Sequence, residues 1–207
     1  MTRDISGCHY FRGTKMTQRG PQTLARFYGF ESVEAVADSL PQDAAVLDAG
    51  AGASRFGHTI AAMRPDVRWT NLDVGYLDES VLAVLQKTAP ENVTFVRGSI
   101  TEAAELLPHS NQDRVFSFFA LNYLGRFQIA GVRQLVRAAK PTGQVALGKL
   151  WIVRDQVATP STIKFSPDPS NKSVVSHITQ ALNPLEGGAP PLPGVEYSAI
   201  RGDDSVK

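Results

Sequence analysis

A glycine-containing stretch in the first third of the chain constrains the fold most: residues 44–57, with the sequence AAVLDAGAGASRFG. Its apolar start at 46–47 suits a buried strand, and Gly50 and Gly52 allow a sharp turn with no Cβ in the way of a ligand. Apolar residues then recur at helical spacing: Phe56, Ile60 and Met63. A strand, a glycine turn and a helix in this order are typical of a loop that binds a nucleotide cofactor.

The composition limits the class of protein. With 207 residues, of which 43% are hydrophobic, the chain can bury one substantial core, and one domain is expected. Lys and Arg together number 21 against 20 for Asp and Glu, so the chain lacks the strong basic field of a protein that holds nucleic acid by charge. A nucleic-acid partner is therefore not expected.

Cysteine and hydropathy patterns bear on the compartment. Cys8 is the one cysteine, and no apolar segment of signal-peptide type follows the N-terminus. No apolar run approaches the ~20 residues that span a bilayer. We therefore expect a cytoplasmic protein without membrane insertion. No Cys, His or acidic cluster has metal-ligand spacing, so no metal is predicted, and the oligomeric state is left open.

Beyond the glycine stretch, apolar β-rich runs alternate with helical patterns. Strands are expected at 66–73, 92–97, 113–121 and 145–153, and helices at 23–40 (one broken or two short), 78–90, 102–107 and 129–139. Such alternation predicts an α/β fold, a Rossmann-like doubly wound and mostly parallel sheet with helices on both faces.

The ends of the chain are less regular. Residues 1–40 are interpreted as an N-terminal arm and helix that form a cap, and 41–207 as the Rossmann-like domain. Within it, 158–207 is rich in proline and glycine and less regular, with a helix expected at 174–182 and a last strand at 195–200.

Two acidic residues discriminate between cofactors. Asp73 ends the second strand, twenty-three residues after Gly50, where a carboxylate can accept both hydroxyl hydrogens of an adenosine ribose. Nicotinamide and adenosyl cofactors both use that contact. In a dinucleotide fingerprint G-x-G-x-x-G, however, the third position is Arg55, whose bulk opposes close pyrophosphate and helix packing. Asp48 would also repel a pyrophosphate but suits a positive amino group and a sulfonium, as in S-adenosylmethionine.

Five short motifs follow one another between Ala44 and Val153: D-x-G-x-G at Asp48, Gly50 and Gly52; an acid, Asp73, closing the second strand; the turn Gly98-Ser99-Ile100; the run from Asp113 to Leu124, with Ala120-Leu121-Asn122-Tyr123; and Lys140-Pro141-Thr142-Gly143. In this order they resemble the motifs of class I S-adenosylmethionine-dependent methyltransferases.

The resemblance implies a class I methyltransferase fold, S-adenosyl-L-methionine as the cofactor, and methyl transfer as the reaction. A small-molecule acceptor is preferred because the near-neutral charge gives no sign of nucleic-acid binding. It places cofactor binding on Asp48, Gly50, Ala51, Gly52, Ala53, Asp73, Val74, Ser99, Ile100 and Phe118. The chain departs from the family pattern at Ser54, where a third glycine is usual, and at Ser99, where an adenine-contacting acid is usual. An antiparallel hairpin that closes the family's sheet has little room after Ile200, so it is expected to be incomplete.

Methyl transfer is an in-line displacement on an already activated carbon, so the protein has mainly to position the reactants and exclude water. No catalytic residue is assigned from the sequence. Asn122, Tyr123 and His9 are the candidates for substrate contact. Each has an ordinary alternative, because a tyrosine after a strand often packs and a lone histidine often makes a simple hydrogen bond. Asp73 could likewise cap a nearby turn.

Two other functions remain open at this stage. A nicotinamide-dependent oxidoreductase is disfavoured by Arg55 and Asp48. A methyltransferase-like binding or scaffold protein with a degenerate cofactor site is motivated by Ser54, Ser99 and the short C-terminus.

Overall fold

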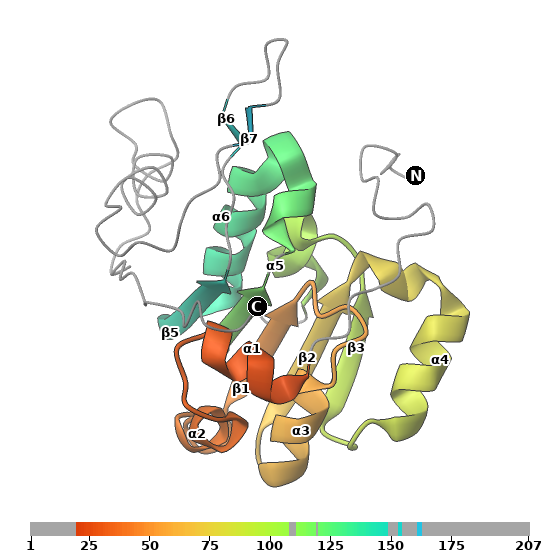
Figure 1. Cartoon of the computed structure of the whole chain (residues 1–207), viewed down its shortest axis with the longest axis vertical. Coiled ribbons are helices and arrows are strands. Elements are labelled where there is room, and N and C mark those ends of the chain that lie inside the picture. The colour runs from red at the N-terminus through yellow and green to blue at the C-terminus, as the bar shows by residue number, and fades with distance from the viewer. Residues whose placement is uncertain (1–19, 108–110, 119, 149–152, 155–160, 163–207) are drawn as a thin grey trace.

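The computed structural model describes residues 20–107, 111–118, 120–148, 153–154 and 161–162. These residues form a five-stranded sheet in the order β3-β2-β1-β4-β5, and every neighbouring pair of its strands is parallel (Figure 1). The strands are β1 Ala45–Ala49, β2 Arg68–Asp73, β3 Val93–Arg97, β4 Gln112–Phe118 and β5 Ala139–Gly148. The predicted α/β fold with a doubly wound parallel sheet is thus confirmed.

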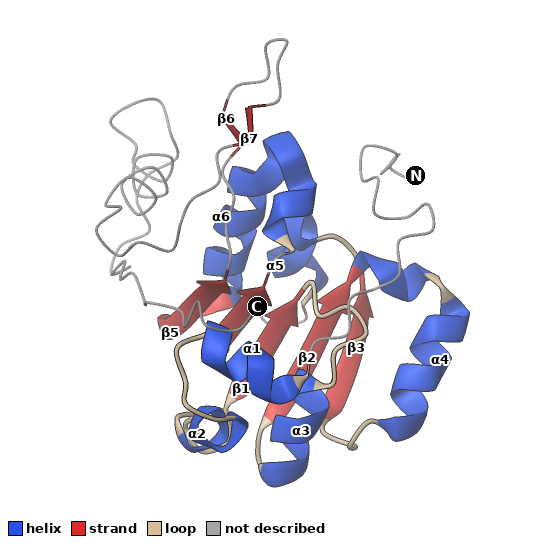
Figure 2. Ribbon diagram, in the orientation of Figure 1, coloured by secondary structure: helices blue, strands red, loops and turns tan. Residues whose placement is uncertain are grey.

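Helices cover both faces of the sheet (Figure 2). On one face lie α1 Pro21–Phe27, α2 Val33–Asp38, α3 Phe56–Met63 and α4 Glu79–Thr88. On the other lie α5 Ala103–Leu106 and α6 Gln128–Ala138. Short 3-10 segments connect several elements: η2 Val74–Leu77, η3 Ile100–Glu102 and η4 Leu121–Phe127.

Alternation along the strands assigns their side chains to two cores. Val46, Trp69 and Phe116 are buried under α1, α2 and α3, in a core that includes the buried residues of both N-terminal helices. Leu47, Leu72 and Val115 are buried under α5 and α6. Because side chains alternate with a period of two in a strand, the odd and even residues of each strand belong to different cores. We call these the α3 face and the α6 face of the sheet.

The α3 face is built around Trp69. Its indole ring stacks 5.9 Å from the Phe116 ring, and the Phe56 ring meets it edge-on at 5.7 Å. A Cβ added to Gly57 would collide with the indole, so the glycine is what lets α3 approach the sheet. Sequence and packing therefore agree on a helix that follows the glycine turn and lies directly against β2.

The predicted helical region 23–40 is two short helices. Gly29 follows the first with a φ of +83°, a conformation that favours glycine. Ser32 begins the second, because its side chain accepts a hydrogen bond from the Ala35 N–H at 3.1 Å. Asp78 begins α4 in the same way, because its Oδ1 accepts a hydrogen bond from the Ser80 N–H at 3.0 Å.

Two expected element boundaries were wrong. The fourth strand ends at Phe118 rather than at residue 121, because Leu121 begins η4 and is buried in the core of the α6 face. The fifth strand begins at Ala139, and the motif at 140–143 is an irregularity within it rather than a turn before it. Gln112 pairs with Ala139 whereas Arg114 already pairs with Gln144, so the motif residues bulge from the ladder.

Beyond β5 the structure describes only a small antiparallel pair, β6 Val153–Arg154 with β7 Ser161–Thr162. Val153, expected at the end of the fifth strand, belongs to this second sheet. The arm up to residue 19, the helix expected at 174–182 and the strand expected at 195–200 lie outside the described residues. In the described part of the chain, no helix has the length and apolar character needed to cross a membrane.

Candidate functional site

The predicted site residues gather at one edge of the sheet. The strand order reverses between β1 and β4, and in open α/β sheets ligands bind beyond the carboxyl ends of the strands at such a point. The glycine turn follows β1, Asp73 and Val74 stand at the end of β2, Ser99 and Ile100 follow β3, and Phe118 ends β4. Because parallel strands end at the same edge, these residues from distant parts of the sequence share it.

The glycine turn needs its glycines for conformation and for space. Gly50 and Gly52 have φ values of +76° and +58°. The Gly50 N–H donates to the Leu72 carbonyl at 2.7 Å, which ties the turn to β2. A Cβ on Gly50 would collide with the side chain of Ala120, which follows β4. The turn is therefore packed between β2 and the segment after β4.

Asp73 holds the glycine turn with one carboxylate oxygen and caps η2 with the other. Oδ2 accepts from the Gly52 N–H at 2.8 Å, and Oδ1 accepts from the Gly75 N–H at 2.6 Å. The residue is 5% exposed; burial raises the pKa of Asp73, and these two hydrogen bonds lower it. Turn capping, the ordinary alternative for this carboxylate, is thus observed. Ribose binding stays a prediction, which would use the second lone pair of each oxygen.

Asp48 is as buried as Asp73 but differs from it in hydrogen bonding. It is 5% exposed, and no hydrogen bond to its carboxylate is found among the described residues. Burial, and then the nearby negative charge of Asp73, raise the pKa of Asp48 to about 7. A carboxylate in this condition favours any cation that reaches it, because an added positive charge offsets both effects.

Two residues of the loop bear on the choice between cofactors. Ser54 is buried, and its Oγ accepts from the Phe56 N–H at 3.1 Å at the start of α3. Arg55 is exposed, so its bulk does not obstruct the packing of the helix on the sheet, which depends on Gly57. Arg55 therefore gives no packing reason against a dinucleotide cofactor. The negative charge of Asp48 is the physical reason that remains.

The turn after β3 is closed by its own side chains. Ser99 Oγ accepts from the Thr101 N–H at 3.2 Å and lies 2.8 Å from Thr101 Oγ1. Ile100 is buried in the core of the α6 face and also approaches Gly50. These two predicted cofactor contacts therefore have structural roles already, and cofactor binding by them stays a prediction.

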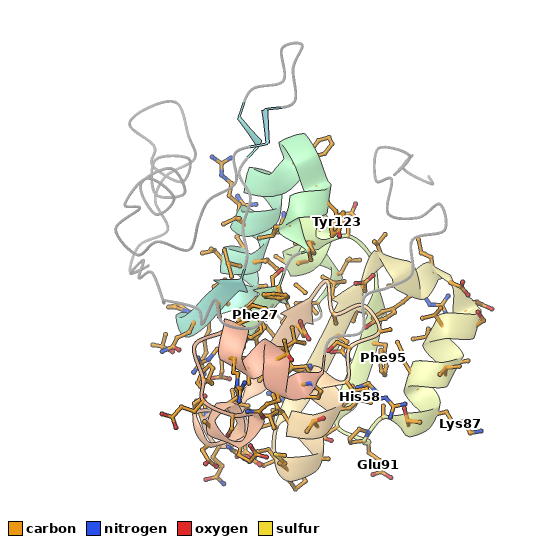
Figure 3. All side chains as sticks on the ribbon, in the orientation of Figure 1. Phe27, His58, Lys87, Glu91, Phe95 and Tyr123 are labelled. Carbon is orange, nitrogen blue, oxygen red and sulfur yellow. The ribbon has the colours of Figure 1, made fainter. Side chains whose placement is uncertain are left out.

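Phe118 is joined at the end of β4 by two aromatic residues that the sequence did not single out. The Phe27 ring stacks on it at 4.5 Å between centroids, and the Tyr28 ring lies edge-on at 6.1 Å. Both come from the end of α1, so α1 covers this part of the sheet edge (Figure 3). Two adjacent aromatics within the predicted helical region 23–40 were the sequence signal for this contact.

The remaining predicted residues differ in their exposure to solvent. Tyr123 is 43% exposed on η4, on the side where the strands end (Figure 3), and Asn122 belongs to the same segment. Ala51 is buried and Val74 is half-buried. Ala53 packs against a small apolar cluster of Tyr76, Leu82 and Leu85. His9 lies outside the described residues, so its place relative to Asn122 and Tyr123 stays a prediction.

Histidine and metal chemistry gain no support at this edge. His58 is buried between α3 and α4, where its Nε2 lies 3.2 Å from the Leu85 carbonyl oxygen and its ring meets Phe95 (Figure 3). Burial lowers the pKa of His58. Within the part of the chain that the structure describes, no three His, Cys, Asp or Glu side chains are grouped so as to hold a metal ion.

Comparison with known proteins gives similarity to solved structures. No family model and no curated protein sequence matches the chain. A TehB-like SAM-dependent methyltransferase from Corynebacterium glutamicum is 18% identical over 56% of this chain and 59% of its own length, with a TM-score of 0.45. TrmN from Thermus thermophilus is 22% identical over 56% and 35%, with a TM-score of 0.46.

A third solved structure, precorrin-6y C5,15-methyltransferase from Geobacter metallireducens, is 27% identical over 57% of this chain and 62% of its own length, with a TM-score of 0.44. The chain thus spans less than two thirds of each of these three proteins. At these scores the comparisons leave the activity and the substrate of this chain to be argued from its own residues, and what those residues establish here is an α/β fold.

Proposed function

We propose that the chain binds S-adenosyl-L-methionine at the carboxyl edge of β1 and β2 and is a methyltransferase for a small-molecule acceptor. The observation that carries the proposal is Asp48, a buried carboxylate without a hydrogen-bond partner among the described residues, directly before a glycine turn. A cationic amino group is the ligand chemistry that such a carboxylate favours. A pyrophosphate there would add negative charge beside two buried acids.

The residues at the edge fit the parts of this cofactor. Asp48 would accept the amino group, the backbone of the glycine turn would lie along the aminoacyl end, and Asp73 would accept from the ribose hydroxyls. Ser99 and Ile100 would flank the adenine, and Phe118 would close the site from β4. When bound, the cofactor supplies a methyl group already activated by its sulfonium.

The chain's own contribution is then positioning and exclusion of water. Asp73 fixes the glycine turn through the Gly52 amide and caps η2 through the Gly75 amide, so the backbone around the proposed ligand is pre-organised. The aromatic residues Phe27, Tyr28 and Phe118 cover the same edge with apolar rings. A small-molecule acceptor is favoured because the net charge of +1 provides no field that would hold nucleic acid.

Isothermal titration calorimetry with S-adenosylhomocysteine tests the proposal. We expect saturable heat with the wild-type chain and a loss of at least about tenfold in affinity in Asp48→Asn, because a charge-assisted contact is removed. Ser117→Ala is the matched control, because it removes a buried hydroxyl from the opposite face of the sheet. The proposal would be overturned if the wild-type chain bound no S-adenosylhomocysteine, or if Asp48→Asn bound it as tightly as the wild-type chain does.

Thermal shift separates the two other functions. An oxidoreductase would be stabilised by NAD more than by S-adenosylhomocysteine, because ligand that binds only the folded state raises the melting temperature. A methyltransferase-like protein with a degenerate site would be stabilised by neither. The degenerate-site function is supported by Asp73 and Ser99, because both side chains already accept hydrogen bonds from backbone amides.

A further inference from the structure

Asp48 shares its surroundings with a second buried polar side chain, Asn71. The two residues are register partners on the adjacent parallel strands β1 and β2. Asp48 lies two residues after Val46 and Asn71 two after Trp69, and both of those residues belong to the core of the α3 face. Because strand side chains alternate, Asp48 and Asn71 point to the same face of the sheet as neighbours across the strand pair.

The amide of Asn71 is oriented by the tryptophan beside it. Asn71 is 1% exposed, and its Oδ1 accepts from the Trp69 indole N–H at 2.9 Å. This bond fixes which end of the amide is the acceptor, and leaves Nδ2 as a buried donor with no hydrogen-bond partner in the described part of the chain. An unpaired buried donor is costly, so its retention on the strand neighbour of Asp48 calls for an explanation.

Tyr28 packs from the helical layer on the β4 neighbour of Asp48. It is 4% exposed, and its ring centroid lies 4.7 Å from that of Phe116, the register partner of Asp48 on β4. Burial raises the pKa of Tyr28, and the negative charge of Asp48 raises it further, so the phenol stays protonated. A protonated phenol has an O–H to donate, as the Asn71 amide has N–H groups.

We propose that Asn71 and Tyr28 are positioning residues for Asp48, which orient its carboxylate and favour its ionised form for a cationic ligand group. The inference rests on the proposed function for the identity of that ligand. Donor dipoles act more strongly in a buried, low-dielectric environment than in water, so two of them beside one carboxylate can offset part of its burial.

Other charged groups near Asp48 act in known directions. Asp73 on β2 opposes ionisation of Asp48 by its negative charge. On β4, Arg114 lies 6.0 Å from the Phe116 ring centroid on the same face of the sheet. On α3, Arg55 is exposed and His58 faces Leu85. None of these groups is changed in the test, so a change in the titration of Asp48 reports on the two donors.

The test measures the titration of Asp48 in the ligand-free chain by carbon-13 NMR of its carboxyl group. Removing a donor destabilises the ionised form, so the midpoint should move to higher pH, by about one unit in Asn71→Leu and by less in Tyr28→Phe. Ser117→Ala removes a buried unpaired hydroxyl on the α6 face and should leave the midpoint unchanged. A residue that only fills space would not move it.

Binding of S-adenosylhomocysteine across pH supplies the functional readout. Since the cation requires ionised Asp48, affinity should rise with pH through the midpoint, and at pH 7 Asn71→Leu should bind about fivefold more weakly than wild type. Asp48→Asn should lose the pH dependence.

The outcomes are separable. Unchanged midpoints in both Asn71→Leu and Tyr28→Phe overturn the inference, and Tyr28→Phe decides alone if Asn71→Leu does not fold. Shifted midpoints in a chain that binds no S-adenosylhomocysteine at any pH support the positioning role and overturn the proposed function.

Discussion

Two carboxylates lie near the carboxyl ends of neighbouring strands, and they differ in their hydrogen bonding. Asp48 and Asp73 are each 5% exposed and lie on the same face. Asp73 accepts two backbone N–H groups, from Gly52 and Gly75, whereas Asp48 has no hydrogen-bond partner among the described residues. Equal burial with unequal hydrogen bonding separates a carboxylate that maintains the structure from one that is available to a ligand.

The difference also predicts how each residue affects stability. A buried acceptor that satisfies two amides stabilises the fold, because removing it leaves those amides without partners. A buried carboxylate without partners opposes folding whenever it is ionised. Substitutions at the two positions should therefore change the free energy of unfolding in different ways, and this comparison can be tested directly.

The largest effect is expected for Asp73→Ala. Two charge-assisted hydrogen bonds are lost and the Gly52 and Gly75 amides remain, so the free energy of unfolding should fall by about 3–5 kcal/mol. Urea denaturation at pH 7 measures it. Asp73→Asn is the matched control, since it keeps one acceptor oxygen and should lose roughly half as much. Equal stability of Asp73→Ala and wild type would mean that the carboxylate does not hold the turn.

Asp48→Asn should change the pH dependence of stability. Because the pKa of Asp48 is raised to about 7 in the folded chain, its contribution to stability is present at low pH and is lost as pH rises through 7. Between about pH 5 and pH 8 the wild-type chain should lose roughly 2–3 kcal/mol through this group. The variant should not lose this amount, as urea titrations at both pH values would show. Parallel pH profiles would place Asp48 in a more solvated environment than the structure does.

The sequence was sufficient for the order of strands and helices, and for the edge of the sheet where the candidate site lies. Periodicity and glycine placement report local conformation, and the strand-turn-helix pattern at 44–57 reports it well. Which groups form hydrogen bonds with a side chain depends on the tertiary structure. Nothing in the local sequence of Asp73 says that two amides from different turns converge on it, and nothing around Asp48 says that none do.

The motif after α6 shows the same limit. Lys140 and Asp113 were matched as separate motif residues, yet they form an ion pair with each other, and Asp113 also accepts from the Ala45 N–H at 3.0 Å. Both lie near the amino ends of β4 and β5, away from the candidate site. Gly143 sits where a Cβ would lie 2.5 Å from the Gln112 carbonyl oxygen, so the bulge requires it. Resemblance identified these residues, and only the fold assigned them a role.

A smaller loss of stability is expected when one Cβ is added to the glycine turn that Asp73 holds. Gly52 has a φ of +58°, so Gly52→Ala should cost about 1–2 kcal/mol of unfolding free energy while leaving the Gly52 amide in place for Asp73. Gly20→Ala is the control, with a φ of −63° and nothing within 4 Å of an added Cβ, and should stay within about 0.5 kcal/mol of wild type. A neutral Gly52→Ala would show that the turn relaxes to another conformation.

The smallest effect extends the comparison to the third strand. Ser99 resembles Asp73 in capping a turn, but among the described residues its Oγ contacts only the N–H and hydroxyl of Thr101, in a three-residue 3-10 segment. Ser99→Ala should therefore cost less than about 1 kcal/mol of unfolding free energy. If this hydroxyl is committed to its own turn, affinity for S-adenosylhomocysteine should change less than about threefold, by calorimetry. A tenfold loss in affinity with unchanged stability would instead assign Ser99 to the ligand, and would group it with Asp48 rather than with Asp73.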